Sequence, residues 1–225
     1  DRRCLGGGAM PSTENRLPPV NPDNMNTVNI GRYQPSNWYS YELIVAHYGS
    51  RTAERSGVPL LNHIHEGLVV LDTLDADQDT AEAYCLHPLI QEDGTMLDTA
   101  QRYISPNRGP GQLASLILAL EYRGIANGHL SHHTTLYDDG SVRPLNIRLG
   151  PAHQVRQMLI ADKVQNRKDF EQYHITTHPH SKQLQAYFKK WFTALSIQPE
   201  EYAKYCRIID HWKRATTSEL AAHDL

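Results

Sequence analysis

Four residues have side chains that could together hold a divalent metal ion: His63, His87, Asp162 and Asn166. Two imidazoles and a carboxylate form a ligand set that suits many divalent transition metals. Asp162 and Asn166 are four positions apart, so their side chains share one face if the segment is helical. The alternative is that these histidines are ordinary core or surface residues, as most of the thirteen histidines in the chain must be.

The metal hypothesis requires three helical segments to meet. A helix is predicted to open at Pro59, because proline at the first turn lacks only an N–H that the helix does not use. Its apolar side chains recur at the helical spacing: Leu60, Ile64, Leu68 and Leu71. Asp77 or Asp79 can cap the next helix, which carries the second histidine. A late helix, with the aspartate, is predicted over residues 151–173.

Helical patterns also cover most of the remaining sequence. Further helices are predicted over residues 38–47, 112–130, 181–196 and 199–214. Asp139-Gly140 is a turn signal between two short extended segments, which allows a small β-hairpin within residues 131–149. The predicted fold class is therefore all-α, a helical bundle with strand limited at most to this hairpin.

Composition narrows the class of protein further. The chain has 225 residues, of which 40% are hydrophobic and 21% charged, and its formal net charge is -3. These values exclude a coiled coil, a membrane-spanning protein and a wholly disordered chain, and they require no nucleic-acid partner. Three cysteines without a paired motif favour a reducing, cytoplasmic location. We expect a leader and proline-rich arm over residues 1–37 and one helical domain over 38–225, which could form a homo-oligomer.

Four stretches occur in the order typical of one known family. They are residues 46–71 (AHYGSRTAERSGVPLLNHIHEGLVVL), 81–93 (AEAYCLHPLIQED), 158–170 (MLIADKVQNRKDF) and 184–195 (LQAYFKKWFTAL). Together they resemble the motifs of the HD-domain (p)ppGpp hydrolases, of the SpoT type and the short metazoan single-domain type. The resemblance covers about residues 40–196. It implies an HD-type helical bundle that hydrolyses a nucleotide with the help of a divalent metal.

The resemblance implies a metal site with one ligand missing. His63, His87 and Asp162 match metal ligands of the family, and the implied ion is divalent, with Mn²⁺ expected. The aspartate that follows the second histidine in the family is Pro88 here, which has no ligating atom. A site with two histidines and one carboxylate remains. Because proline lacks an N–H and disfavours the α conformation before it, the third helix is predicted to end or kink at this point.

The resemblance also implies residues for water and substrate. Gln91 and Glu92 match the pair that handles the attacking water, and Asn166 matches an amide that positions a ligand or substrate oxygen. Arg51 or Arg55 would contact the nucleotide. Gln91 cannot accept a proton, whereas the family's glutamate can. Two functions therefore stay open: a nucleotide phosphohydrolase resembling (p)ppGpp 3'-pyrophosphohydrolases, and a degenerate HD domain that binds a nucleotide or a partner without hydrolysis.

Two further patterns allow other interpretations. Residues 132–135 and 174–178 contain His-x-Thr units, and two such units act as acid and base in two-histidine phosphodiesterases, where each lies on a strand. Lys163, Arg167 and Lys168 flank the late metal aspartate. These cations could face phosphates, although we expect a solvated helix surface.

Overall fold

The computed structural model describes residues 28–104, 111–130 and 146–223. Within these ranges the chain is helical and has no strand, which confirms the all-α class for the part described. Most of the expected hairpin, residues 131–145, lies outside the described residues, and the remainder, 146–149, has no regular secondary structure. No described helix is both long and apolar enough to cross a membrane.

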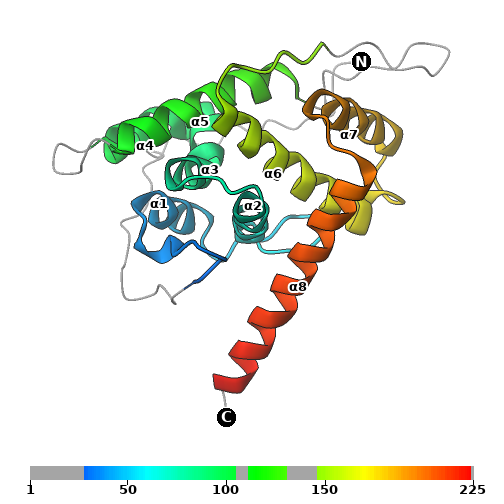
Figure 1. Ribbon diagram of the computed structural model, residues 1–225, viewed down its shortest axis with the longest axis horizontal. Helices are drawn as coiled ribbons and strands as arrows, with labels where there is room; N and C mark the ends of the chain where they lie inside the picture. The colour runs from blue at the N-terminus through cyan, green and yellow to red at the C-terminus, as the bar shows by residue number, and fades with distance from the viewer. Residues whose placement is uncertain (1–27, 105–110, 131–145, 224–225) are drawn as a thin grey trace.

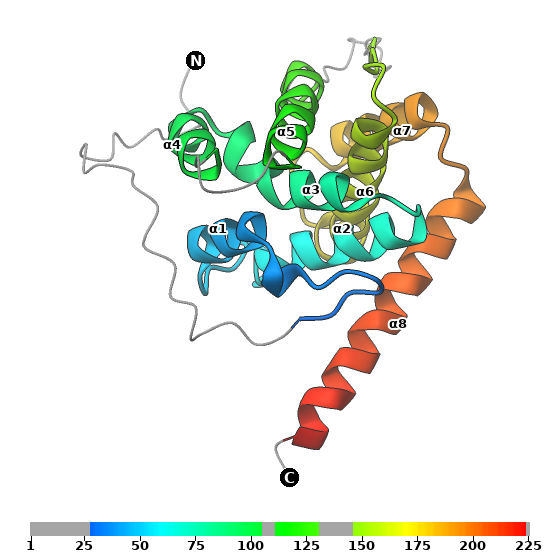
Figure 2. The same cartoon turned by 60° about the vertical axis from the view of Figure 1, so that its left-hand side comes forward.

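Three of the helices lie at the centre, and the others pack around them. In chain order they are α1 (Tyr39–Tyr48), α2 (Leu61–Thr73), α3 (Gln78–Gln91), α4 (Asp93–Tyr103), α5 (Gly111–Gly128), α6 (His153–Asp169), α7 (Ser181–Leu195) and α8 (Pro199–His223). A 3-10 turn, η2 (Pro35–Asn37), precedes α1, and a π-helical turn, η4 (Phe170–His174), follows α6. The helices α2, α3 and α6 contact one another, α5 packs along α3, and α7 packs against α6 (Figure 1). The helix α8 crosses α2 and α6, and its C-terminal end extends beyond the other helices (Figure 2).

A glycine allows α2 and α3 to approach closely. A Cβ atom at Gly67 would lie 2.1 Å from the hydroxyl oxygen of Tyr84, so only glycine fits there without a shift. Tyr84 is fully buried, and its ring lies beside the rings of His63 and His87. The contact between the two helices therefore sets the spacing of their histidines.

The sequence predicts that the third helix ends or kinks at Pro88. The helix α3 does not end there but continues to Gln91. Proline removes one main-chain hydrogen bond, and the Nδ1 of His87 takes the released acceptor, the Tyr84 carbonyl oxygen, at 2.6 Å. Arg123 of α5 donates to the carbonyl of Gln91 at 2.6 Å, which satisfies an acceptor at the helix end.

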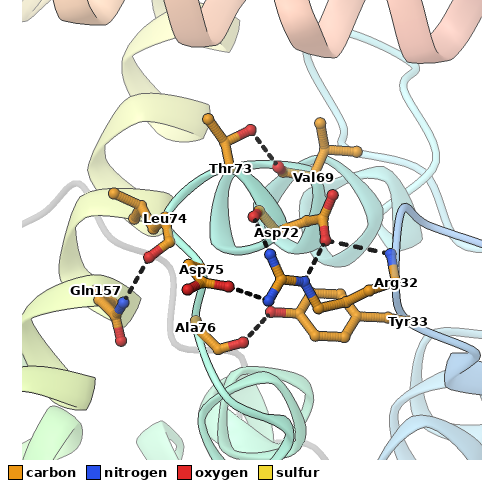
Figure 3. A network of polar contacts seen from close by, with 9 residues as sticks. All are labelled: Arg32, Tyr33, Val69, Asp72, Thr73, Leu74, Asp75, Ala76 and Gln157. Carbon is orange, nitrogen blue, oxygen red and sulfur yellow. Dashed lines mark hydrogen bonds and ion pairs between the residues drawn. The ribbon is translucent and has the colours of Figure 1, made fainter.

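The described end of the N-terminal arm, residues 28–37, packs on the body of the same chain. Ile30 and Tyr33 are buried in the common hydrophobic core. Tyr33 donates its hydroxyl hydrogen to the carbonyl of Ala76 at 2.6 Å, and Arg32 pairs with Asp72 and Asp75 (Figure 3). This segment therefore belongs to the folded unit.

Candidate metal centre

His63, His87 and Asp162 come together from α2, α3 and α6. The Nε2 of His63 lies 3.1 Å from the Nε2 of His87. The Oδ1 of Asp162 lies 3.6 Å from the first of these nitrogens and 3.9 Å from the second. His87 and Asp162 are buried, whereas the His63 side chain is 20% exposed. The three residues form a group that could hold a metal ion.

The spacing of the donor atoms suits one shared ion. Ligands about 2.1 Å from an ion are about 3.0 Å apart in octahedral coordination and about 3.4 Å apart in tetrahedral coordination. The observed separations run from 3.1 to 3.9 Å. The three separations therefore lie within about 0.5 Å of the tetrahedral value and within about 0.9 Å of the octahedral value.

The other ring nitrogen of each histidine faces a hydrogen-bond acceptor. Gln165 donates through Nε2 to the Oδ2 of Asp169 at 2.8 Å, so its Oε1 is the atom that faces the Nδ1 of His63, at 2.7 Å. The Nδ1 of His87 donates to the carbonyl oxygen of Tyr84. Both ring protons therefore lie on Nδ1, and both Nε2 lone pairs face the shared space. Second partners of this kind orient metal-ligating histidines.

Asp162 is held as an ionised carboxylate. Asn166 donates to its Oδ1 at 2.7 Å, and the Nζ of Lys163 lies 2.6 Å from its Oδ2. Lys163 is itself buried, with its Nζ 4.8 Å from the centre of the Trp191 ring. Burial opposes ionisation, but the Lys163 ammonium holds the pKa of Asp162 well below its ordinary value. The carboxylate therefore keeps its negative charge at neutral pH.

The charge states of the group suit a cation. Burial and the neighbouring His63 lower the pKa of His87 to about 3, so its imidazole is neutral at physiological pH. Neutral imidazole and ionised carboxylate are the forms that bind metals. Two lone pairs and a carboxylate that face one another repel, and a divalent ion among them would replace that repulsion by attraction.

The three residues line a cleft of about 580 Å³. The structure brings three of the other expected site residues, Gln91, Asn166 and Arg55, to the same cleft. The described residues that line it do not include Glu92 or Arg51. Glu92 is exposed immediately before α4, and Arg51 donates to main-chain carbonyl groups of α1. The sequence left Arg51 and Arg55 as alternative nucleotide contacts, and of these two only Arg55 lines the cleft.

The basic residues that flank Asp162 do not form the expected solvated surface. Lys163 and Lys168 are buried and pair with carboxylates. Arg167 lies over the rings of Phe192 and Tyr202, at 4.6 and 4.5 Å from their centres. Their aliphatic and cationic parts therefore stabilise the helix packing around α6.

The two-histidine phosphodiesterase interpretation is wrong for the unit at residues 174–178. This segment begins at the end of the π-helical turn η4 and continues as a turn, not as a strand. The other unit, residues 132–135, lies outside the described residues. The histidines of residues 174–178 therefore need another explanation.

Two partners of the metal-site histidines were not expected from the sequence. They are the carbonyl group of Tyr84 and the amide of Gln165. Every residue has a main-chain carbonyl group, so residue identity cannot indicate which one serves as a partner. The helical spacing of Asp162, Gln165 and Asp169 could have indicated the amide, since positions three and four apart share a face.

No protein-family model, curated protein or solved structure matches this chain. The function must therefore be inferred from the geometry of the site and from the residues that build it.

Proposed function

We propose that the protein is a metal-dependent phosphohydrolase that acts on a nucleotide, of the kind that removes pyrophosphate from (p)ppGpp. The observation that carries this proposal is the convergence of His63, His87 and Asp162 on one wall of an open cleft, with both Nε2 lone pairs turned inward. The resemblance of the sequence motifs to the HD-domain hydrolases supports the phosphate chemistry, and Mn²⁺ is the ion we expect.

The surrounding residues hold the ligands in place before substrate binds. A divalent ion held at this centre supplies Lewis acidity toward water and a phosphoryl oxygen. Gln165 and the Tyr84 carbonyl fix the two imidazole rings, while Asn166 and Lys163 fix the carboxylate. Such support reduces the reorganisation that the reaction requires.

We assign the proton-accepting role to Asp169 instead of Glu92. Asp169 lines the cleft, and Gln165 links it to His63. No described residue donates to its Oδ1. Burial and the nearby Glu66 raise the pKa of Asp169, which brings it closer to the range in which a carboxylate exchanges protons.

The alternative function is nucleotide binding without hydrolysis, and Gln91 favours it specifically. Its side chain lines the cleft where the family resemblance places a glutamate, and an amide cannot take a proton from water. Pro88, also on the cleft, supplies no ligand atom. Metal binding and turnover must therefore be measured separately.

The test begins with metal content. The full chain is incubated with Mn²⁺, free ion is removed by gel filtration, and bound manganese is measured by mass spectrometry. We expect about one ion per chain in the wild type and almost none in His63→Gln, whose part-exposed side chain can be replaced without unfolding. His47→Gln is the matched control, because His47 is a half-buried histidine that does not line the cleft.

The same samples are then assayed for phosphate or pyrophosphate released from purine nucleotides. Metal-dependent release that His63→Gln abolishes supports the hydrolase. A nucleotide that raises Tm without any release supports the binding domain instead. Failure of the wild type to retain Mn²⁺ would overturn the metal centre itself.

A further inference from the structure

A second group of basic side chains lines the cleft and has no part in the metal centre. Arg55 comes from the segment between α1 and α2, His174 from η4, and His178 from the turn that follows. All three lie on the wall of the same cleft as His63 and Asp162. Three separate segments of the chain thus bring imidazole and guanidinium groups to one place.

These side chains have unused hydrogen-bond donors. Among the described residues, the Arg55 guanidinium has no hydrogen-bond or ion-pair partner, and the His174 ring has no hydrogen bond. The Nδ1 of His178 accepts the backbone N–H of His180 at 3.0 Å. The ring proton of neutral His178 therefore lies on Nε2, which remains a donor.

The described carboxylates of the cleft are occupied elsewhere. Asp162 pairs with Lys163, and Asp169 accepts from Gln165. Neither interaction involves Arg55 or the histidines of residues 174–178. The Arg55 guanidinium is thus a cation without a carboxylate partner among the described residues, and an anionic ligand could pair with it.

The mutual influence of these groups is consistent with their closeness. The pKa of His178 is lowered mainly by burial. Smaller lowering effects come from Arg55, His180 and His174. These basic groups are therefore near enough to influence one another electrostatically. Basic groups gathered in this way favour the binding of an oxyanion.

We infer that Arg55, His174 and His178 form a binding site for a phosphate-type oxyanion on the cleft wall. Guanidinium and imidazole N–H groups are the donors that proteins use for such anions. As a statement about the substrate, this inference rests on the proposed function, and it narrows the class of nucleotides that the protein would act on. The substrate carries a second anionic group besides the one at the metal centre.

The test uses inorganic pyrophosphate and the metal-free full chain in EDTA, so that no ion at the metal centre contributes. Binding is measured by isothermal titration calorimetry at constant ionic strength. We expect Arg55→Ala and His178→Ala each to weaken binding about tenfold or more, because each removes a hydrogen-bond donor to the charged anion. Arg51→Ala is the matched control, since Arg51 is an exposed arginine off the cleft, and it should bind like the wild type. Tm of each variant confirms that it is folded.

Each result bears on the site itself. Wild-type affinity in both Arg55→Ala and His178→Ala would overturn the inference, as would the absence of pyrophosphate binding by the wild type. The His63→Gln variant separates the two proposals, because it should lose Mn²⁺ but keep pyrophosphate binding. If wild type binds pyrophosphate through Arg55 but retains no Mn²⁺, the anion site stands and the hydrolase fails.

Discussion

A single proline sets the tautomer of His87, a candidate metal ligand. An N–H at position 88 would point to the carbonyl oxygen of Tyr84, four residues earlier in the helix. Pro88 has no N–H, and the Nδ1 of His87 uses that oxygen instead, at 2.6 Å. Pro88 thus leaves the Nε2 of His87 as the lone-pair nitrogen, directed at His63 and Asp162.

We predict that Pro88→Ala weakens Mn²⁺ binding about 10- to 100-fold, the usual loss when an outer-shell partner is disturbed. The new N–H would compete for the Tyr84 oxygen, so His87 would populate both tautomers. Stability should move the other way, since alanine is favoured over proline inside a helix by up to about 3 kcal/mol. The measurements are Mn²⁺ titration, Tm in EDTA and the ¹⁵N shifts of the His87 ring.

Weaker Mn²⁺ binding together with higher stability would distinguish this positioning role from general damage to α3. Pro199→Ala is a suitable control, because Pro199 begins α8 and does not line the cleft. Unchanged Mn²⁺ affinity in Pro88→Ala, with a normal fold, would refute the positioning role.

At the scale of helices, Glu66 and His65 of α2 attach α8 to the central group through an ion pair and a ring contact. Glu66 of α2 is fully buried and pairs with Lys168 of α6 and Lys213 of α8. Beside it, the Nε2 of His65 lies 2.7 Å from the hydroxyl of Tyr41, and its ring packs edge-on against Trp212 of α8. Neither residue is among the described residues that line the cleft, so we assign them the role of holding the helices together.

We predict that His65 makes stability depend on pH in the mildly acidic range. Burial lowers the pKa of His65 to about 4, whereas the unfolded chain binds this proton near pH 6.5. The unfolded state is therefore favoured as pH falls from about 6.5 to about 4, and the loss approaches about 1.4 kcal/mol per pH unit. Above pH 6.5 the contribution is fully present. Urea unfolding in EDTA at pH 7, 6 and 5 measures it.

Subtraction isolates His65 from the other buried histidine, His87. In His65→Gln the slope of the free energy of unfolding against pH should fall by about the amount given above, whatever the absolute stability. His211→Gln is the control, because His211 is exposed on α8 beside Trp212. A slope in His65→Gln that equals the wild-type slope would show that His65 is not the responsible group.

Periodicity predicts the helices well wherever one face is apolar. The segments that became α2, α5, α6 and α7 were expected within a few residues of their ends, and Asp77 caps α3 by accepting from the N–H of Thr80 at 2.8 Å. The helix α4 was missed, because its sequence is largely polar and begins Asp-Gly. Its stability comes from packing on α1, α3 and α5, which a local pattern cannot reveal.

The site was predictable only in part. Three ligands on three helices could be chosen because motif resemblance fixed their order, while spacing along the chain could not show that they meet. Lys163 shows the limit most clearly. A lysine beside an aspartate on a helix is usually solvated, yet here it is buried against Trp191 and pairs with that aspartate. The packing of α7 against α6 decides this, and such tertiary contacts are not written in the local sequence.

At the scale of the whole molecule, the arm and the helices form one hydrophobic core. Ile30 and Tyr33 belong to the same buried cluster as the apolar residues of α1, α2 and α3. The polar contacts of Arg32 with Asp72 and Asp75 lie at the surface around them (Figure 3). We therefore expect the described chain, arm included, to unfold as one cooperative unit.

The two kinds of contact should contribute very differently to the free energy of unfolding. Ile30→Ala should lower it by about 2 to 5 kcal/mol, since Ile30 is fully buried and its removal leaves a cavity. Arg32→Ala should cost far less than Ile30→Ala, because the Arg32 side chain is 48% exposed and water screens its ion pairs. Guanidinium unfolding is followed by the fluorescence of Trp38 beside the arm and Trp212 on α8, each observed alone after the other tryptophans are replaced by phenylalanine. Coincident transitions from both probes are expected in every variant. A separate early transition at Trp38, or an Ile30→Ala loss as small as that of Arg32→Ala, would mean that the arm is an appendage and not part of the core.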